Sequence, residues 1–352
     1  MMNASCDSPS KTSEEETAKS TETSKDAESQ FRLGVQYREG MEVVQSDAEA
    51  AKCFRKAAAL GHVRAQYNLG RCYEEGKGVD KDEAEAAKWY LKAAEQGDIF
   101  CQYLVGCIYL EGQGLVQDEA EAAKWYRKAA DQGDADAQFS LGLCYTKGEG
   151  VPLDIEEAVK WFKKSAEQGR AVPQANLGII YYYGKGVPRD YAEASKWFRK
   201  AADQGISEAE ASLGICYSNG EGVPLDMEEA VKWFKRASEK GNAAAQCSLG
   251  RSYSTGKGIP KNVPMAFSWT RKAAEQGDVT AQTDLGAYFG AGYGAPKDNV
   301  LAYMWSNLAA AQGSSMAKVV RETVTKEMSK EEIAEAQRKS REWKSKKRDL
   351  NR

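Results

Sequence analysis

The residue types that carry out most enzyme chemistry occur in this chain, but their spacing does not bring an active site together. The 352 residues include one histidine, His62, which follows Gly61 and has no second histidine with which to bind a metal ion. Gly-x-Gly segments such as residues 148–150 resemble loops that hold phosphate groups. A dinucleotide-binding loop of this kind follows a β-strand, whereas these segments lie between two predicted helices. We therefore interpret His62 as a residue at a loop surface and the Gly-x-Gly segments as turns, and we predict no metal and no cofactor.

Acidic residues are abundant enough to suggest a catalytic pair, but the most regular of them repeat at one position. A catalytic group would be expected once, whereas an acidic residue at the start of every helix is explained by capping of free backbone N–H groups. The tryptophans also repeat, on what we predict to be an inner helix face, so we assign them to the core and not to a sugar-binding surface. No catalytic residue is predicted. The repeated aspartates are Asp82, Asp118, Asp154, Asp190, Asp226 and Asp298.

Eight cysteines raise the question of disulfides. Cys72, Cys144 and Cys216 occupy one repeat position in alternate units. Packed helices lie about 8–10 Å apart, whereas a disulfide needs Cα atoms within about 7 Å. Cys101 and Cys107 lie on different faces of one predicted helix. We therefore predict free thiols and a reducing compartment.

The strongest pattern in the sequence is repetition. Glycine recurs every 36 residues in two series, and tryptophan recurs in a third. One unit of this length is too short to bury a core, so neighbouring units must stack. The first glycine series is Gly34, Gly70, Gly106, Gly142, Gly178, Gly214, Gly250 and Gly286. The second runs from Gly61 to Gly313, and the tryptophans run from Trp89 to Trp305, with Cys53 at the matching place in the first unit.

Residues 134–169 show what one unit contains. Ala137, Leu141 and Tyr145 are spaced by four residues, which places them on one face of a helix. Residues 148–152 form a Gly- and Pro-containing turn that ends this helix. Asp154 and Glu157 have the spacing of a capping box at the start of a second helix. Each unit is therefore predicted to be an antiparallel helix pair.

A glycine inside the first helix of each unit needs a physical reason. Glycine in a helix interior costs about 1 kcal/mol relative to alanine. We expect this glycine to allow close approach of the two helices, with a Trp or Phe of the next repeat lying over the gap.

Three repeated motifs carry a resemblance to a known family. They are A-Q-x-x-L-G-x-x-Y, G-x-G-V-P-x-D and E-A-x-K-W-F/Y-x-K-A-A-x-Q-G. Over residues 29–313 they resemble Sel-1-like repeats, a branch of the tetratricopeptide superfamily. The first unit departs from the pattern because residues 40–42 lack the second loop glycine, and the last resembles the terminal unit of bacterial members. The resemblance implies an all-α fold, a right-handed α/α solenoid of eight 36-residue helix–turn–helix repeats with a C-terminal capping helix.

The segments outside the repeats differ in composition. Residues 1–28 are rich in Ser, Thr, Glu and Lys, so we expect a disordered polar tail. Residues 314–352 are expected to form a capping helix and a basic tail. The net charge of −3 does not indicate a nucleic-acid partner. No run of 18 apolar residues is present, so no membrane span is predicted, and we expect a cytoplasmic location, with a cleaved leader left open.

The first helices are expected to carry the function. In tetratricopeptide arrays the first helix of each unit lines a concave face, and the resemblance places variable positions of this chain in that groove. Exposed apolar residues of this extent mark a partner site; the alternative is that they pack against each other along the superhelix. The predicted partner-binding residues are Tyr67, Arg71, Glu74, Tyr103, Leu110, Phe139, Leu143, Ile179, Tyr182, Ile215 and Arg251.

We predict that the chain is not an enzyme but an adaptor or scaffold that binds a protein partner, as a peptide or a helix, in this groove. A preformed surface loses little freedom on binding, which favours affinity. Two alternatives stay open. One is a hydrolase resembling the β-lactamase-like members of the family, and the other is a secreted host-interaction factor.

Overall fold

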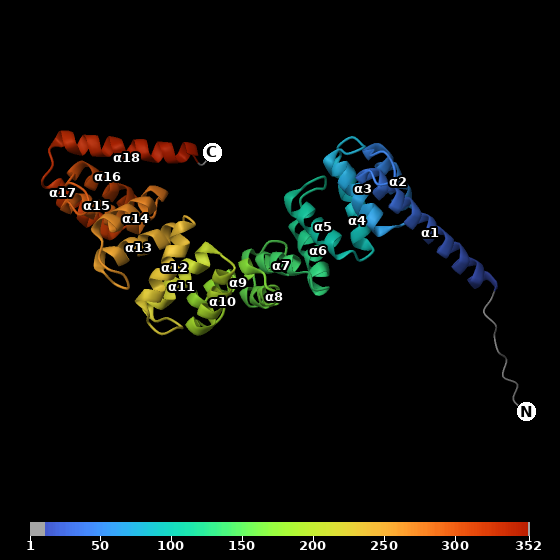
Figure 1. Ribbon diagram of the computed structural model, residues 1–352, viewed down its shortest axis with the longest axis horizontal. Helices are drawn as coiled ribbons and strands as arrows, with labels where there is room; N and C mark the ends of the chain where they lie inside the picture. Colours follow the sequence, from blue (N-terminus) through green and yellow to red (C-terminus); the bar gives the residue numbers. More distant parts are fainter. Residues whose placement is uncertain (1–10, 351–352) are drawn as a thin grey trace, which may run out of the picture. The chain divides into compact units, whose positions relative to one another are not determined.

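The computed structural model describes residues 11–350, with side chains over residues 23–345, and every regular element in that part of the chain is an α-helix (Figure 1). The prediction of an all-α fold is confirmed. The helices divide into two compact units, one ending at Gln168 and the other beginning at Gly169, which we call the N-terminal and C-terminal units. The N-terminal unit contains α1 (Lys11–Glu39), α2 (Asp47–Ala59), α3 (Val63–Glu75), α4 (Glu83–Glu95), α5 (Ile99–Glu111), α6 (Glu119–Asp131), α7 (Ala135–Lys147) and α8 (Ile155–Glu167). The C-terminal unit contains α9 (Ala171–Tyr183), α10 (Tyr191–Asp203), α11 (Ser207–Asn219), α12 (Met227–Glu239), α13 (Ala243–Thr255), α14 (Val263–Gln276), α15 (Val279–Ala291), α16 (Asn299–Ala311), α17 (Ser315–Thr325) and α18 (Lys330–Leu350).

The ends of the paired helices follow from local sequence. Asp154, before α8, accepts a hydrogen bond from the backbone N–H of Glu157 at 3.0 Å. The expected return bond from the Glu157 side chain is replaced by an ion pair with Lys160 at 2.8 Å. Each first helix from α3 to α15 ends at a left-handed glycine, such as Gly148 with φ 73°, a conformation that glycine adopts without steric cost.

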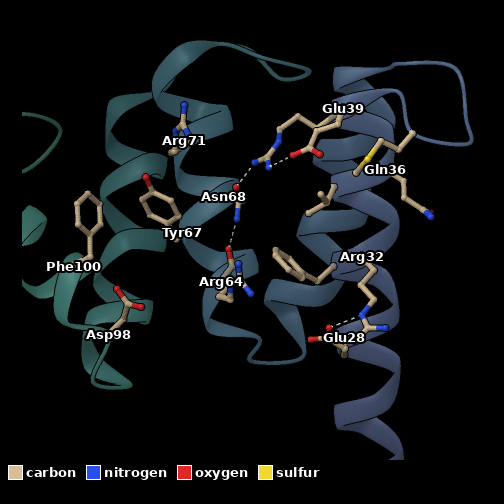
Figure 2. Close-up of a pocket in the computed structure, with 14 residues that line it drawn as sticks. Glu28, Arg32, Gln36, Glu39, Arg64, Tyr67, Asn68, Arg71, Asp98 and Phe100 are labelled. Carbon is tan, nitrogen blue, oxygen red and sulfur yellow. Dashed lines mark hydrogen bonds and ion pairs between the residues drawn. The ribbon is translucent and has the colours of Figure 1, made fainter.

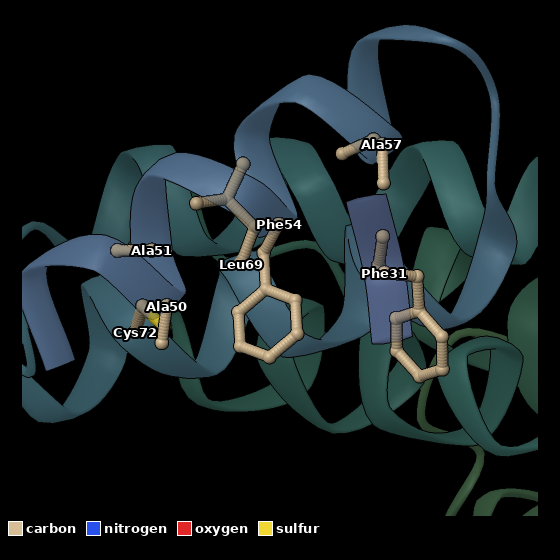
Figure 3. Packing of buried hydrophobic residues seen from close by; sticks show 9 residues of the cluster. Phe31, Ala50, Ala51, Phe54, Ala57, Leu69 and Cys72 are labelled. Atoms are coloured by element: carbon tan, nitrogen blue, oxygen red, sulfur yellow. The ribbon is translucent and has the colours of Figure 1, made fainter. Parts of the chain in front are cut away.

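Six of the eight mid-helix glycines make room for an aromatic ring of the same helix pair, whereas Gly250 and Gly286 face Thr270 and Ser306. A Cβ added to Gly142 in α7 would lie 2.5 Å from the Phe162 ring in α8. The sequence analysis expected an aromatic residue from the next repeat, and that expectation is wrong. Phe54 takes the same place over Gly34 in the first pair, and Figure 3 shows it in one cluster with Leu69 of the following first helix. The glycine series therefore sets how closely the two helices of a pair approach.

The tryptophans join neighbouring pairs. Trp125 in α6 is buried in one cluster with Tyr90 of α4 and Val105 of α5, so it packs toward the preceding pair. The ammonium group of Lys128 lies 3.4 Å from the centre of the Trp125 ring and covers its outer side. Five of the seven repeated tryptophans are buried, and Trp89 and Trp269 are partly buried. Their assignment to the core is confirmed.

The second glycine of each turn allows contact between consecutive pairs. Gly150 has φ 71°, and a Cβ there would lie 1.9 Å from the carbonyl oxygen of Glu119, in the preceding pair. The Gly-x-Gly segments are therefore turns shaped by packing. Glu42 holds the equivalent place in the first pair with φ 63°, and no earlier pair stands before it in the described residues.

The chain ends differ in detail from what the sequence analysis expects. Residues 11–28, expected to be disordered, form the first part of α1, while residues 1–10 lie outside the described residues. Ala27 is buried and Glu28 contacts His62, so packing anchors α1 before the first repeat glycine, and the Glu, Lys and Ala residues upstream are favourable in a helix. Instead of one capping helix, two follow the repeats. α17 packs on α15 and α16, and α18 packs on α16 through Ala336 and Trp343.

Candidate functional site

The predicted partner-binding residues all lie on first helices, but they are exposed to different degrees. Arg71, Glu74 and Arg251 are exposed, whereas the eight apolar and aromatic residues are partly buried. In the N-terminal unit these eight include Tyr67, Tyr103, Leu110, Phe139 and Leu143, and in the C-terminal unit they include Ile179, Tyr182 and Ile215. These eight side chains are therefore partly covered by other residues of the same unit.

The aromatic rings of the second helices provide most of that cover. The ring centres of Tyr103 and Tyr126 are 5.8 Å apart, and those of Phe139 and Phe162 are 5.5 Å apart. Burial raises the pKa of Tyr103 to about 12, so its hydroxyl stays protonated at neutral pH. Tyr103 and Phe139 contribute to packing as well as to the surface.

The first helices at the start of the N-terminal unit leave an open groove. It has a volume of about 950 Å³ and is lined by α1, α3 and the beginning of α5 (Figure 2). Of the predicted residues, Tyr67 and Arg71 lie in it. Figure 2 shows Tyr67 and Phe100 side by side on the α3–α5 side, facing α1 across the groove. The lining residues are Glu28, Phe31, Arg32, Val35, Gln36, Arg38, Glu39, Met41, Arg64, Tyr67, Asn68, Arg71, Asp98 and Phe100.

The charged residues of this groove are held by specific contacts. Arg38 donates to Oδ1 of Asn68 at 2.5 Å and forms an ion pair with Glu39 at 3.2 Å. Arg71 forms an ion pair with Glu75, which also pairs with Lys77 at 2.6 Å. These two cations lower the pKa of the Glu75 carboxyl, with Lys77 contributing more. The guanidinium of Arg64 lies 5.2 Å from the centre of the Phe31 ring.

His62 supports the edge of the groove. Its Nδ1 accepts a hydrogen bond from the backbone N–H of Ala65 and caps α3, while its Nε2 lies 3.0 Å from Glu28. The imidazole ring stacks on Phe31 with 4.6 Å between ring centres. Its side chain is 15% exposed, so the expectation of a loop-surface residue is wrong. The contact with His62, followed by that with Arg32, lowers the pKa of Glu28.

The C-terminal unit has a smaller and more apolar pocket on its first helices. It has a volume of about 200 Å³ and brings together three predicted residues, Ile179, Tyr182 and Ile215. The Tyr182 hydroxyl donates to Glu221 at 2.6 Å, and burial raises its pKa. Tyr183, beside it, is 59% exposed. This pocket can hold one apolar side chain.

Arg251 does not belong to that pocket. Its Nε and Nη2 bind the two oxygens of Asp284 in α15 at 2.6 and 3.1 Å. The guanidinium fork is therefore largely occupied by an ion pair within the unit. Of the predicted residues, the structure groups Tyr67 with Arg71 and Ile179 with Tyr182 and Ile215, but it does not group Arg251 with either set.

Phe100 and Arg64 are two of the twelve lining residues of this groove that sequence reasoning missed. They occupy one repeat position, near the start of the first helix, where other units have Asp136, Val172 and Glu208. Phe100 is 55% exposed. An aromatic residue at a position that holds no aromatic residue in the other repeats was the available signal.

Six of the seven described cysteines are buried, and Cys107 is partly exposed. Seven cysteines are free, and Cys6 lies outside the described part of the chain. Burial raises the pKa of Cys144 to about 11 and that of Cys216 to about 12, so these thiols stay protonated at neutral pH. Within residues 11–350 no cluster of His, Cys, Asp and Glu could hold a metal ion, and no helix there is long and apolar enough to cross a membrane.

Comparison with known proteins identifies the repeat. The family model described as the Sel1 repeat matches eight consecutive segments, 27–62, 63–98, 99–134, 135–169, 174–206, 207–242, 243–278 and 279–314. The solved structure of a Sel1 repeat protein from Oxalobacter formigenes is 34% identical, with a TM-score of 0.66, and the match covers 88% of this chain and 90% of that one. A protective antigen of uropathogenic Escherichia coli with the same repeat fold is 31% identical, with a TM-score of 0.47, over 90% of this chain and 84% of that one. No curated protein sequence matches the chain. The eight matched repeats and the Oxalobacter formigenes relative show that the chain belongs to the Sel1 repeat family.

Proposed function

We propose that this chain is a protein-interaction adaptor that binds an extended peptide or a helix of a partner on the first-helix face of its repeats. It has no catalytic step of its own in this proposal. The observation that carries the proposal is the contrast between the first and second helices. First helices present aromatic and arginine side chains around open hollows, and these residue types anchor most protein interfaces.

The second helices present a different surface. In each of the six second helices from α2 to α12, one exposed lysine is paired with the glutamate three residues earlier, within 2.5–3.2 Å. Such pairs are well hydrated and internally neutralised, which disfavours docking. The lysine–glutamate pairs are Lys52–Glu49, Lys88–Glu85, Lys124–Glu121, Lys160–Glu157, Lys196–Glu193 and Lys232–Glu229.

Site-specific photo-cross-linking tests the proposal. A photoreactive amino acid is placed at Arg71 or Tyr183 on first helices, and at Lys163 or Lys235 as matched exposed positions on second helices. In extract of the source cell, the first-helix positions should form discrete adducts with a partner, and the second-helix positions should not. Adducts formed only from Lys163 and Lys235 would place the binding face on the second helices and refute the proposal.

A further inference from the structure

We propose that the groove over α1, α3 and the start of α5 binds an acidic segment of a partner protein, with one large apolar side chain of that segment held against Tyr67 and Phe100. This inference rests on the proposed function and adds the chemistry of the bound segment. The residues that carry it lie within the N-terminal unit.

The groove is positive in a chain whose net charge is −3. Four arginines line it against three acidic residues, which leaves one positive charge. At the rim, Glu75 is shared between Arg71 and Lys77, so the rim adds no net negative charge. An acidic segment is therefore attracted here and repelled by the chain as a whole.

The acidic residues of the groove are already engaged within the protein. Glu28 contacts Arg32 and His62, and Glu39 contacts Arg38. Asp98 caps α5 by accepting a hydrogen bond from the backbone N–H of Cys101 at 2.8 Å. These carboxylates therefore fix the architecture of the groove.

The arginines keep donors for a ligand. A guanidinium has five N–H donors and binds a carboxylate through two of them. Arg64 is exposed and its guanidinium lies over the Phe31 ring, a cation–π contact that uses none of its N–H groups in a hydrogen bond to a carboxylate. Arg32 uses its Nε for Glu28, which leaves both Nη groups. Side-chain carboxylates of a bound segment can therefore pair with Arg64 and Arg32.

The apolar side of the groove supplies an anchor point. The rings of Tyr67 and Phe100 meet edge to face with 5.5 Å between centres, and Phe100 stays 55% exposed despite this contact. In Figure 2 both rings face the space that the arginines border. An aromatic or large aliphatic side chain of the partner would cover Phe100, and such anchors dominate the affinity of interfaces.

A nucleic acid is the other ligand that arginines and aromatic rings can bind. The three carboxylates in the lining disfavour it, because every phosphate of a bound strand carries a negative charge. The observations therefore favour a peptide.

Selection from a random-peptide display library on the intact chain tests the proposal. Enriched peptides should combine Asp or Glu with an aromatic or large aliphatic residue. A synthetic copy of an enriched peptide, acetylated and amidated so that only side chains carry charge, is then titrated against variants. Arg64→Glu and Phe100→Ala should each weaken binding at least ~10-fold, since the first reverses a charge that attracts the acidic segment and the second removes the apolar anchor point. Lys163→Glu, which makes the same charge change on a second helix, should bind as the parent does.

Circular dichroism and thermal melting of each variant check that it is folded. Arg64→Lys should weaken binding less than Arg64→Glu, because the charge is kept while the two-donor fork is lost. Replacing the acidic residues of the peptide with Asn and Gln, or its aromatic residue with Ala, should also weaken binding. Raising the salt concentration should weaken the acidic peptide most.

The proposal is overturned if the enriched peptides are neutral or basic, or if they bind the Arg64→Glu variant unchanged. It is also overturned if nothing is enriched, or if a single-stranded oligonucleotide binds the groove more tightly than the peptide does. The photo-cross-linking experiment separates these failures from that of the proposed function. First-helix adducts without acidic-peptide binding would leave the adaptor function standing and remove only this inference.

Discussion

Replacing Lys240 by glutamine should destabilise the C-terminal unit, and adding Glu210→Gln should restore most of the lost stability. This expectation comes from a contact between the start of the first helix and the end of the second, which is made by charged residues in the α11–α12 pair and by two glutamines in six other pairs. In those six, a buried glutamine near the start of the first helix accepts a hydrogen bond, at 2.7–2.9 Å, from a glutamine at the end of the second helix. The pairs are Gln66–Gln96, Gln102–Gln132, Gln138–Gln168, Gln174–Gln204, Gln246–Gln276 and Gln282–Gln312.

The α11–α12 pair holds charged residues at the same place. Glu210 is fully buried, with Oε1 at 2.8 Å from Lys240 Nζ and 3.0 Å from Arg236 Nη2. Its other oxygen, Oε2, is buried without a hydrogen-bond partner, so these two cations alone compensate the charge. Arg236 also donates to the carbonyl oxygen of Ala202 at 3.4 Å, whereas Gln246 serves the matching carbonyl of Ser238 in the next pair.

The magnitude follows from this geometry. Removing one partner of a buried ion pair costs about 3–5 kcal/mol. Here the Lys240 side chain is 41% exposed and Arg236 remains, so the expected loss for Lys240→Gln is about 1–3 kcal/mol. Glu210→Gln alone should cost less, because a glutamine can still accept from Lys240, whose ammonium reaches water. The double variant recreates the glutamine pair found in the other repeats and should lie within about 1 kcal/mol of the parent.

Urea denaturation followed by circular dichroism gives the free energies, and hydrogen exchange read by mass spectrometry shows whether the loss lies in α11 and α12. The second readout matters because repeat proteins can unfold in parts. The reasoning fails if Lys240→Gln is no weaker than Glu210→Gln. It fails equally if the double variant is as unstable as Lys240→Gln alone.

Three further outcomes test other parts of the structure. Leu141→Ala should lower the free energy of unfolding by about 2–5 kcal/mol, because the side chain is fully buried, and unchanged denaturation would show that this core face is misassigned. Gly150→Ala should cost more than about 3 kcal/mol in the same assay, because its Cβ would meet the Glu119 carbonyl. Gly169→Ala should cost only about 1 kcal/mol, because Gly169 has φ 92° but a Cβ there would have no atom within 4 Å. Equal losses for the two variants would show that backbone strain alone causes both. Among the described cysteines of the folded protein at pH 8, a thiol reagent should modify Cys107 first, since it is partly exposed and the other six are buried and should react after denaturation. Peptide mapping of the alkylated protein checks the order, and rapid labelling of Cys144, whose pKa is raised to about 11, would contradict it.

Sequence reasoning succeeded where the determinants are local. Asp154 and Gly148 mark the start of one helix and the end of another, and the structure uses both as the pattern predicts. It was wrong about which ring covers the mid-helix glycine, because Trp161 and Phe162 are adjacent in sequence but differ by about 100° around the helix. Trp161 packs toward the preceding pair and Phe162 toward its own. That choice depends on how pairs stack, which the motif alone does not specify.

The candidate site was predictable only in part for a related reason. The resemblance places variable first-helix positions in a groove, and two of them, Tyr67 and Arg71, do line one. Whether such a residue is exposed depends on the ring that the second helix places beside it. Tyr103 meets Tyr126 and is partly covered, whereas Phe100, one turn earlier in α5, meets Tyr67 edge to face and stays 55% exposed.

Residues that differ from the repeat pattern fall into those whose charge or shape is balanced by contacts within the chain and those that are not. Glu210 breaks the glutamine pattern, but Lys240 and Arg236 compensate it inside the chain, so packing explains the change without any ligand. Glu42 breaks the glycine pattern where no preceding pair of the described residues crowds it. Phe100 breaks the pattern on an open surface and remains more than half exposed after its contact with Tyr67. A departure from the repeat that no contact within the chain explains points to a partner. For this reason we propose the groove bordered by Phe100 and Arg64 as the binding site.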